Sequence, residues 1–365
     1  MAAIPSTMKA LVAVRDAAEV SAPSSVAGRG ATLRDVPVPS ISGSEILVKV
    51  TAVVLNPTDF KHIDLLSPEG AVIGCDYAGV VAKVGGDATG SWKVGDRVAG
   101  WVHGGLYEDR GSFAQFLKVD ADLAWKVPDG VSDLAAATYG VSATTAVLGL
   151  QKHLGLPWPE TTTTTTTTGA GAGEPILVYA ASTGAGLYAV RLAKLAGRTV
   201  VATASPHNFD LVRRYGADAV FDYKSPTAAA DIRAAYPGLR QAFDGISENG
   251  TTEFCAAALQ PGGSVVVLLP PKAAEIDGVK VQHILAYTLF GREFHLLPPR
   301  GPKFPASAED RAVLARFYAL LPGIVGKLEP IPVKELPGGL EGLGEGLNLL
   351  REGKVSGTKL GYKLE

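Results

Sequence analysis

Residues 176–197 read ILVYAASTGAGLYAVRLAKLAG, and this stretch decides the fold. Its first residues, ILVY, are apolar without polar alternation, which predicts a strand buried on both faces. A strand that passes through a turn of small residues into an amphipathic helix is the context of a dinucleotide fingerprint. Ala181, Gly184 and Gly186 let the backbone approach a pyrophosphate, whose charge is stabilised by free amides and by the positive end of the helix.

The fingerprint is imperfect at one position, because Ala180 stands where its strictest form has the first glycine. A tight turn that packs the helix on the strand without any ligand is therefore the alternative. Beyond the turn, buried strands continue to alternate with amphipathic helices to about Leu269. This alternation predicts an α/β fold with a doubly wound parallel sheet.

The segments on either side of this sheet read differently. Before residue 130, short strands are separated by Gly, Pro and Asp, which predicts an antiparallel, barrel-like unit. After Pro299 the chain reverts to helices and short strands, a pattern typical of a tail that completes the first domain. We predict a catalytic domain at 1–150, a Thr/Gly-rich loop at 151–174, a cofactor domain at 175–300 and a C-terminal return at 301–365. The threonine run at 161–168 is either a tolerated insertion or a docking loop.

Composition narrows the class of protein. Of the 365 residues 47% are hydrophobic and 19% are charged, which excludes a disordered scaffold, and the formal net charge of -2 provides no field for nucleic acid or an anionic membrane. Two cysteines are too few for a disulfide framework. Without a run of about 18 apolar residues, the expectation is a cytoplasmic protein with no membrane partner.

The end of the second strand of the cofactor domain bears on the choice of cofactor. An NAD enzyme normally has Asp or Glu about 20 residues past the turn, where it holds the ribose hydroxyls. Here Ser205, His207 and Asn208 take that place, with Arg213 and Arg214 one helical turn later. Donors and cations accept a 2′-phosphate, so the sequence favours NADPH. The alternative for either arginine is a side chain that faces solvent.

The two-part layout resembles the medium-chain dehydrogenase/reductase superfamily, which implies a GroES-like β-barrel domain and a Rossmann domain. Zinc members of that superfamily place cysteine, histidine and cysteine around a catalytic metal. Here Asn56 and Pro57 stand in the first ligand segment and Cys75 replaces the histidine, so we expect no metal. His62 and His103 are interpreted as surface or pocket side chains.

Within the superfamily, NPTDFK at 56–61 resembles the zinc-free quinone oxidoreductase and enoyl reductase branch. Three further stretches resemble the fungal trans-acting enoyl reductases of polyketide synthases, of the lovastatin trans-enoyl reductase type: GVSATTAVLGL at 140–150, SPHNFDLVRRYGADAVFDY at 205–223 and GKVSGTKL at 353–360.

The resemblance implies a set of cofactor contacts from separated segments. They are Thr58, Asp59, Phe60 and Lys61 at the nicotinamide and phosphate region; Ser182, Thr183, Gly184 and Ala185 at the pyrophosphate; Ser205, His207, Asn208 and Tyr223 at the adenosine; Leu268 and Leu269 beside the nicotinamide; and Val355 and Ser356 from the tail. Ordinary packing or capping is the alternative for each of them alone.

Reduction of an activated double bond needs a hydride for the β-carbon, donors for the carbonyl oxygen and a proton for the α-carbon. By family position the donors are Lys61, Thr144 and Thr145, for which a solvent-facing lysine and helix-start caps are the alternatives. The implied substrate contacts are Thr144, Leu289, Phe290 and Gly291. No sequence pattern positions a proton donor, with His103, Tyr107, Tyr139 and water all open.

The predicted function is NADPH-dependent reduction of an α,β-unsaturated polyketide thioester. The partner implied by the resemblance is the acyl carrier protein of a polyketide synthase or hybrid polyketide-peptide synthase. A general NADPH quinone or alkenal reductase is the first alternative, and a nucleotide-binding protein without catalysis is the second. Histidine, charges and prolines in residues 280–302 favour a monomer, because they blunt a sheet edge.

Overall fold

A computed structural model describes residues 3–16, 30–159 and 173–364. The threonine run lies outside these residues. The chain divides into two compact units: unit 1 comprises Met1–Val141, Tyr287–Pro322 and Pro332–Glu365, and unit 2 comprises Ser142–Ala286 and Gly323–Ile331. These boundaries differ from the predicted ones at 150 and 300, because the contacts of the chain change within the helix after Gly140 and again at Tyr287.

Unit 1 is built around a seven-stranded sheet with the order β17-β18-β3-β4-β5-β7, in which β6 also pairs with β3. The strands are β3 (Glu45–Val54), β4 (Asp76–Val84), β5 (Arg97–Trp101), β6 (Phe116–Asp120), β7 (Ala124–Lys126), β17 (Val333–Glu335) and β18 (Lys359–Lys363). All pairs are antiparallel except β17 with β18. The GroES-like part of the predicted fold is confirmed.

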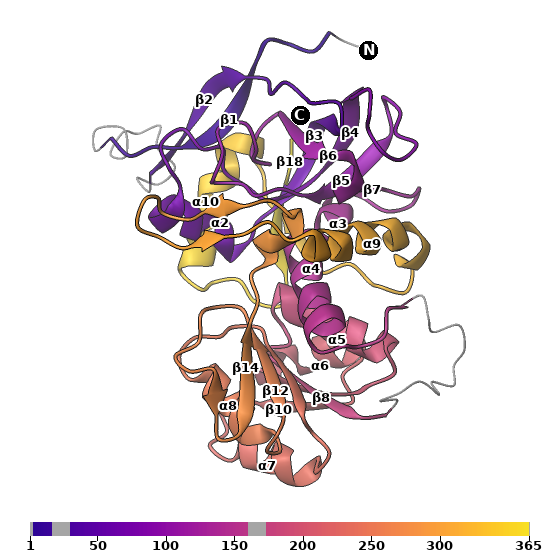
Figure 1. Cartoon of the computed structure of the whole chain (residues 1–365), viewed down its shortest axis with the longest axis vertical. Coiled ribbons are helices and arrows are strands. Elements are labelled where there is room, and N and C mark those ends of the chain that lie inside the picture. The colour runs from indigo at the N-terminus through magenta and orange to yellow at the C-terminus, as the bar shows by residue number, and fades with distance from the viewer. Residues whose placement is uncertain (1–2, 17–29, 160–172, 365) are drawn as a thin grey trace. The chain divides into compact units, whose positions relative to one another are not determined.

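Smaller elements surround this sheet (Figure 1). They are the strand pairs β1 (Thr7–Ala13) with β2 (Ala31–Pro37) and β15 (Phe294–His295) with β16 (Lys303–Phe304), and the helices α2 (Pro57–Lys61), η2 (His62–Leu66), η3 (Ala121–Leu123), α3 (Asp133–Ala137), α9 (Ala308–Ile324) and α10 (Gly339–Arg351). The core gathers Val48 and Val53 of β3, Tyr77 of β4, Leu347 of α10 and Tyr362 of β18. The C-terminal return therefore closes the same core that the first strands begin.

Unit 2 contains the predicted doubly wound sheet, in the order β10-β9-β8-β11-β12-β14-β13. Its strands are β8 (Pro175–Tyr179), β9 (Thr199–Ala204), β10 (Ala219–Asp222), β11 (Gln241–Asp244), β12 (Ser264–Val267), β13 (Glu275–Ile276) and β14 (Val279–His283). Every neighbouring pair is parallel except β13 with β14. The strand order reverses between β8 and β11, and ligands of such sheets bind outside the carboxyl ends of the strands at that point.

The helices that follow these strands are α5 (Gly184–Leu195), η6 (Pro206–Asn208), α6 (Phe209–Arg214), α7 (Ala228–Ala235) and α8 (Thr251–Ala258). Before β8 come α4 (Val141–Val147) and η4 (Leu148–His153), and η7 (Ala286–Phe290) follows β14. None of the helices in the described ranges has both the length and the hydropathy needed to cross a bilayer.

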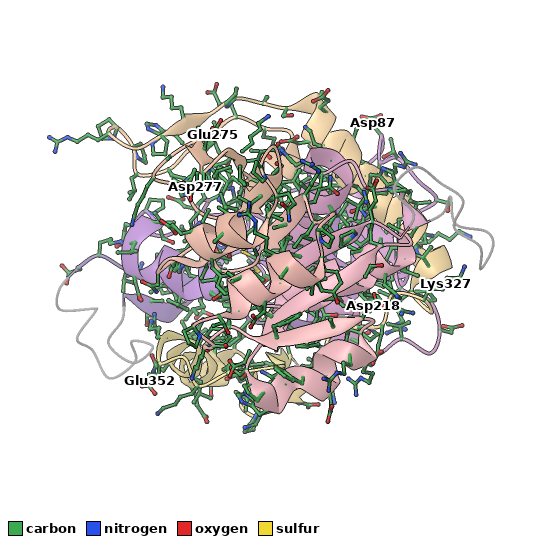
Figure 2. All side chains as sticks on the ribbon, turned by 90° about the horizontal axis from the view of Figure 1, so that it is seen from below. Asp87, Asp218, Glu275, Asp277, Lys327 and Glu352 are labelled. Carbon is green, nitrogen blue, oxygen red and sulfur yellow. The ribbon has the colours of Figure 1, made fainter. Side chains whose placement is uncertain are left out.

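The sheet of unit 2 ends in a very short edge strand. β13 has two residues and pairs with β14 through Ile276 and Glu275. Glu275 and Asp277 are exposed there (Figure 2). A short edge with charged side chains is a common way to prevent strand addition by another chain.

Candidate active site

The turn after β8 is shaped by three small residues. Ala180 has a left-handed backbone with φ of 57°, a conformation that glycine adopts more easily. Thr183 donates its hydroxyl to the carbonyl of Ala180 at 2.9 Å and accepts from the amide of Gly186 at 3.0 Å, so it is the N-cap of α5. A Cβ atom on Gly186 would lie 2.8 Å from the Cα of Ala181 and closer still to the carbonyl oxygen of Ala180. Glycine at 186 is therefore required for the helix to pack on the strand.

The N-terminus of α5 presents backbone N–H groups that a ligand could use. The amides of Ser182, Gly184 and Ala185 have no acceptor in the part of the chain that the structure describes. All three residues are partly exposed at the first turn of a 12-residue helix, where the helix dipole is positive. The turn thus fits the pyrophosphate of a dinucleotide, in the place where the sheet order reverses.

The end of β9 lacks the carboxylate that would hold ribose hydroxyls. Ser205 follows the strand directly, His207 is exposed and Asn208 is buried. Arg213 and Arg214 of α6 are each more than half exposed, and they pair with the carboxylates of Asp210 at 3.3 Å and Glu329 at 3.6 Å. Both arginines therefore lie at the surface of the helix, with their charges partly offset.

Beyond β10, Tyr223 is 37% exposed and packs its ring edge-on against Tyr179 of β8, with centroids 6.2 Å apart. Leu268 and Leu269 lie past the end of β12 in a bend and are half-buried, so they do not belong to the core strand. The amide of Leu268 donates to the hydroxyl of Ser247 at 2.7 Å.

Asp244, at the end of β11, organises this edge of the sheet and was not predicted. Its buried carboxylate accepts from the amides of Ile246 and Ser247 and from the hydroxyls of Thr251 and Thr252, at 2.8 to 3.1 Å. It thereby fixes Ser247 under Leu268. A lone aspartate at the end of an apolar strand, followed by hydroxyl residues, was the available signal.

In unit 1, the NPTDFK stretch forms α2. Asn56 caps the helix, and its backbone N–H donates to the carboxylate of Asp59 at 2.7 Å. Asp59 is 1% exposed, and burial raises its pKa to about 7 against the effect of that hydrogen bond. Lys61 ends the helix and is partly exposed. Asp59 thus holds the start of the helix from inside, while Lys61 stands at its other end.

Thr58 is the polar centre of a small network in unit 1. Its hydroxyl lies 2.7 Å from the hydroxyl of Tyr287 and 3.2 Å from Nδ1 of His62. The Tyr287 hydroxyl is also 3.8 Å from the Sγ of Cys75. Burial raises the pKa of Cys75 and of Tyr287 well above their usual values, so both stay protonated at neutral pH.

A buried lysine lies among the residues that replace zinc ligands. The ammonium group of Lys359, in β18, is 2.5 Å from the side-chain oxygen of Asn56 and 3.2 Å from the carboxylate of Asp76. Asp76 is fully buried and also accepts from the amide of Val141 at 2.7 Å. Within residues 3–16, 30–159 and 173–364 no group of three or more His, Cys, Asp or Glu side chains could hold a metal ion.

Four further predicted residues lie in a buried helix or in a loop. Thr144 and Thr145 are buried in the middle of α4, so they are not helix-start caps. In unit 1, Val355 is half-buried and Ser356 is exposed, both in the loop before β18.

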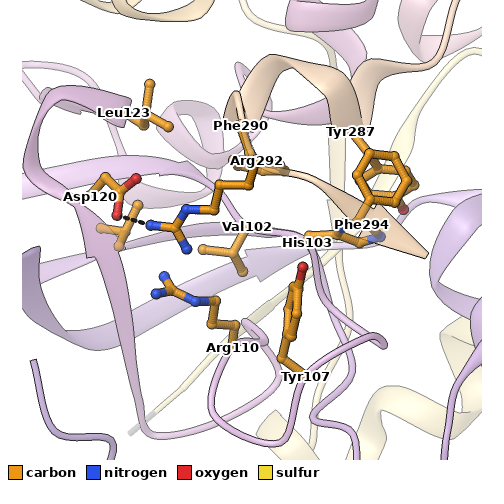
Figure 3. Close-up of a pocket in the computed structure, with 11 residues that line it drawn as sticks. Val102, His103, Tyr107, Arg110, Asp120, Leu123, Tyr287, Phe290, Arg292 and Phe294 are labelled. Atoms are coloured by element: carbon orange, nitrogen blue, oxygen red, sulfur yellow. Dashed lines mark hydrogen bonds and ion pairs between the residues drawn. The ribbon is translucent and has the colours of Figure 1, made fainter. Parts of the chain in front are cut away.

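Unit 1 also contains a pocket with aromatic walls (Figure 3). Its lining residues are Val102, His103, Tyr107, Arg110, Val119, Asp120, Leu123, Tyr287, Phe290, Arg292 and Phe294. Of the predicted substrate residues in this unit, Phe290 lines the pocket. Leu289 is fully buried and does not line it, and Gly291 has a φ of 67° and turns the chain next to Arg311.

Comparison with known proteins agrees with this architecture. Residues 42–129 match the alcohol dehydrogenase GroES-like domain, and residues 184–288 match the family described as zinc-binding dehydrogenase. Among solved structures, CurK enoyl reductase superposes with a TM-score of 0.73 at 20% identity, covering 99% of this chain and 100% of that one. A quinone oxidoreductase of Pseudomonas syringae pv. Tomato gives a TM-score of 0.71 at 20% identity, over 97% and 99% of the two chains. At such identities the likeness shows the fold.

Curated proteins that match by sequence have higher identity to this chain than these solved structures. The trans-enoyl reductase ACTTS2 of Alternaria alternata is 40% identical over 342 residues, which are 91% of this chain and 95% of that protein. The trans-enoyl reductase caaB of Aspergillus niger is also 40% identical, over 92% and 94% of the two chains. The chain therefore belongs to the trans-enoyl reductases of the medium-chain dehydrogenase/reductase superfamily.

Proposed function

We propose that this protein is an NADPH-dependent enoyl reductase that acts on an α,β-unsaturated polyketide thioester held on the carrier protein of a partner synthase. The main support is the 40% identity to trans-enoyl reductases over nearly their full length. It is joined by a turn after β8 whose free amides and glycine at 186 suit a dinucleotide.

The two units contribute different groups to this function. In unit 2 the amides of Ser182, Gly184 and Ala185 hold the pyrophosphate, and Ser205, His207 and Asn208 hold the adenosine ribose and its phosphate. Tyr223 lies at the adenosine end, and Leu268 and Leu269 flank the nicotinamide. In unit 1 the contributions come from Thr58, Phe60, Lys61, Val355 and Ser356, while buried Asp59 fixes the start of α2.

The choice of NADPH rests on the surroundings of Ser205. A carboxylate there would repel a 2′-phosphate, and the nearest acidic side chain along the chain, Asp210, is 99% exposed and already paired with Arg213. A phosphate between Ser205 and α6 would compete with Asp210 for that guanidinium.

The reaction needs hydrogen-bond donors for the developing oxyanion. Bound NADPH supplies a hydride for the β-carbon of the substrate. By family position, the proposed donors to the thioester oxygen are Lys61, which ends α2 in unit 1, and the hydroxyl of Thr144 or Thr145 in α4 of unit 2. A water molecule brings the proton to the α-carbon, because burial raises the pKa of Tyr287 and Cys75 well above their usual values and so makes both weak acids, while it lowers the pKa of His103 and leaves that ring without a proton to give.

The direct test is oxidation of NADPH by the full chain with a crotonyl or 2-methylcrotonyl thioester. We expect turnover that falls at least about 100-fold in Lys61→Met, since loss of an oxyanion donor has this size of effect. Turnover of quinones without turnover of any enoyl thioester would replace the proposal by a general quinone or alkenal reductase. Tight NADPH binding without any turnover would indicate a binding protein.

A second assay tests the proposed partner. In this assay the enoyl group is loaded on an acyl carrier protein. A lower KM for the carrier-bound substrate than for the free thioester is expected. The proposed monomer is supported by the two-residue edge strand β13, which covers the start of β14. Sedimentation at micromolar concentration tests it.

A further inference from the structure

We propose that Lys359 and Asp76 are positioning residues that fix the orientation of α2 through the side chain of Asn56. The helix begins after Asn56 and ends at Lys61, so its orientation sets where this lysine meets the substrate. This inference rests on the proposed function, in which Lys61 donates to the thioester oxygen. All four residues belong to unit 1.

α2 depends on its attachments, because it is a helix of only five residues. A single helical turn is unfavourable in isolation, so its direction is set by the groups that hold its ends. The far end continues into η2 and is held by α10, where Arg351 donates to the carboxylate of Asp64 at 2.7 and 2.9 Å. The start of the helix is held through Asn56.

The side-chain amide of Asn56 is held at both of its polar atoms. Its oxygen accepts from the ammonium group of Lys359 at 2.5 Å, and its nitrogen donates to the carboxylate of Asp76 at 2.9 Å. The reverse orientation would place an NH2 group against the ammonium group and an oxygen against the carboxylate. Charge therefore allows one orientation of this amide. Asn56 is 2% exposed, so water does not replace either partner.

Both partners of Asn56 are themselves held by the fold. The second oxygen of the Asp76 carboxylate accepts from the backbone N–H of Val141 at 2.7 Å. A Cβ atom on Gly140 would lie 2.7 Å from the carboxyl carbon of Asp76 and closer still to that oxygen, so only glycine fits there. Lys359 lies in β18, which pairs with β3, the strand that leads into α2. The frame behind the helix start is thus built from strands and a closely packed loop.

The distances favour positioning over simple neutralisation of charge. The ammonium group is closer to the amide oxygen of Asn56, at 2.5 Å, than to the carboxylate of Asp76, at 3.2 Å. A pair formed only to balance charge gains most when the two charges approach each other most closely. Here the amide bridges the two charges, and this amide belongs to the residue that begins α2.

A tilt of α2 at its start would displace Lys61 at its end. Five positions separate Asn56 from Lys61, which is about 7 Å along a helix axis. A displacement of about 1 Å at a reacting group can cost about 100-fold in rate. The bond of Thr58 to Tyr287 at 2.7 Å remains when the start is released, so the helix can persist in a changed orientation.

Asn56→Ser is the variant that isolates this effect. Serine is as good an N-cap as asparagine, so the helix can still begin there, but its side chain is one bond shorter. The ion pair of Lys359 with Asp76 remains, so the interior keeps its charge balance. Lys359→Met removes the bridge from the other side. Because it also costs stability, its kcat is expressed per folded molecule.

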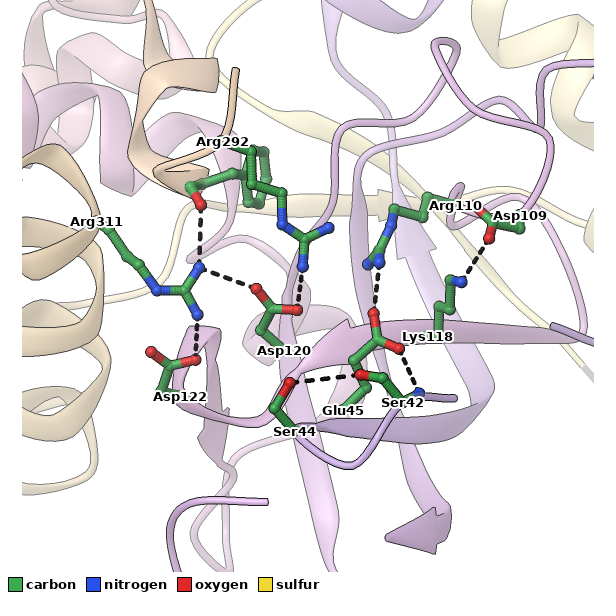
Figure 4. Close-up of polar contacts among 11 residues, drawn as sticks. Ser42, Ser44, Glu45, Asp109, Arg110, Lys118, Asp120, Asp122, Arg292 and Arg311 are labelled. Carbon is green, nitrogen blue, oxygen red and sulfur yellow. Dashed lines mark hydrogen bonds and ion pairs between the residues drawn. The ribbon is translucent and has the colours of Figure 1, made fainter. Parts of the chain in front are cut away.

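The matched control is Lys118→Met in β6 of the same sheet (Figure 4). The side chain of Lys118 is 13% exposed and pairs with the carboxylate of Asp109. Among the described residues this ion pair includes no group of α2. The control therefore removes a largely buried, paired lysine without releasing the helix.

The first readout is a double-mutant cycle with Lys61→Met in the enoyl thioester assay. Asn56→Ser should lower kcat at least about 10-fold and change the KM for the thioester less than about twofold, because a contact of the transition state is weakened. In the Lys61→Met background the same substitution should change kcat less than about twofold, since the group that α2 positions is gone. Lys359→Met should follow this pattern, and Lys118→Met should keep the kcat of the unchanged protein.

Two results of the cycle would overturn the proposal. An equal fall in kcat with and without Lys61 would show that Asn56 only maintains the fold. An unchanged kcat in Asn56→Ser would show that the bridge does not affect the reaction.

The second readout is amide hydrogen exchange, which needs no turnover. Exchange in residues 55–66 should become at least about 10-fold faster in Asn56→Ser and stay unchanged in Lys118→Met. This result in a protein that reduces no enoyl thioester would support the anchoring of α2 and overturn the enoyl reductase. Turnover by the unchanged protein, with neither exchange nor kcat altered in Asn56→Ser, would leave the enoyl reductase standing and overturn the positioning.

Discussion

The turn after β8 and the buried cluster around Lys359 are built by opposite means. The turn uses small residues within seven positions of one another, and its chemistry comes from backbone amides. The cluster uses long polar side chains, and the residues that meet there, Asn56, Asp76 and Lys359, come from distant parts of unit 1. One region presents backbone dipoles at a helix N-terminus, and the other neutralises charge with a buried ion pair.

The difference shows how each region tolerates change. A backbone site depends on shape, so an added atom damages it and a polar substitution nearby does not. A buried ion pair depends on balance, because removing either partner leaves an uncompensated charge in a low-dielectric interior. The substitutions below test these two expectations.

The largest effect is expected from Lys359→Met. Asp76 is fully buried, and burial already raises its pKa against the opposing effect of Lys359. Without the ammonium group this carboxylate must remain unpaired or take up a proton, at about 3–5 kcal/mol in the free energy of unfolding. Urea denaturation of Lys359→Met and of the unchanged protein measures this loss in the free energy of unfolding.

The matched control is Lys363→Met in the same strand, whose ion pair with Glu335 is 67% and 48% exposed. It should change the free energy of unfolding by less than about 1 kcal/mol. Similar losses in the free energy of unfolding in the two variants would contradict this prediction. They would mean that the buried ion pair contributes no more to stability than an exposed one.

Gly186→Val should come next, with an effect on cofactor binding. Its Cβ would lie 2.8 Å from the Cα of Ala181, so α5 must move away from the strand and its amides lose their positions. We expect NADPH affinity to fall at least about 100-fold, about 2.7 kcal/mol, as measured by titration of the fluorescence of the bound nucleotide. Gly326→Ala, also in unit 2, has open space around its Cβ and should bind NADPH normally.

These two regions also differ in what the sequence allowed us to predict. The turn and the doubly wound sheet followed from residues 176–197, since strand, turn and helix are adjacent there and their periods can be read directly. The buried ion pair of Lys359 could not be predicted, because 283 positions separate this residue from Asp76 and nothing in the local sequence distinguishes a buried lysine from a surface one. Arg110 and Arg292, which line the same pocket as Phe290, were not predicted, because nothing in the sequence distinguishes them from surface arginines.

A third effect concerns the pH dependence of stability. The pKa of Asp59 is about 7 in the folded protein and about 3.8 when exposed. From pH 4 to 7 the folded state keeps a proton that the unfolded state has lost, so stability should fall as pH rises, by up to about 1.4 kcal/mol per pH unit. Asp59→Asn should flatten this slope in urea denaturation at several pH values. Asp87→Asn, at an exposed site (Figure 2), should preserve it.

The smallest effect is expected from Ala180→Gly, which separates shape from strain in the turn. An L-residue with a φ of 57° loses about 1–2 kcal/mol relative to its preferred conformations, and glycine does not, although its unfolded chain gains about 0.5–1 kcal/mol of entropy. The net gain in the free energy of unfolding should be below about 1 kcal/mol, with NADPH affinity unchanged. Ala181→Gly, next along the chain and fully buried without a positive φ, should instead lose stability. If both glycines destabilise alike, Ala180 stores no strain, and the missing glycine of the fingerprint is neutral for the turn.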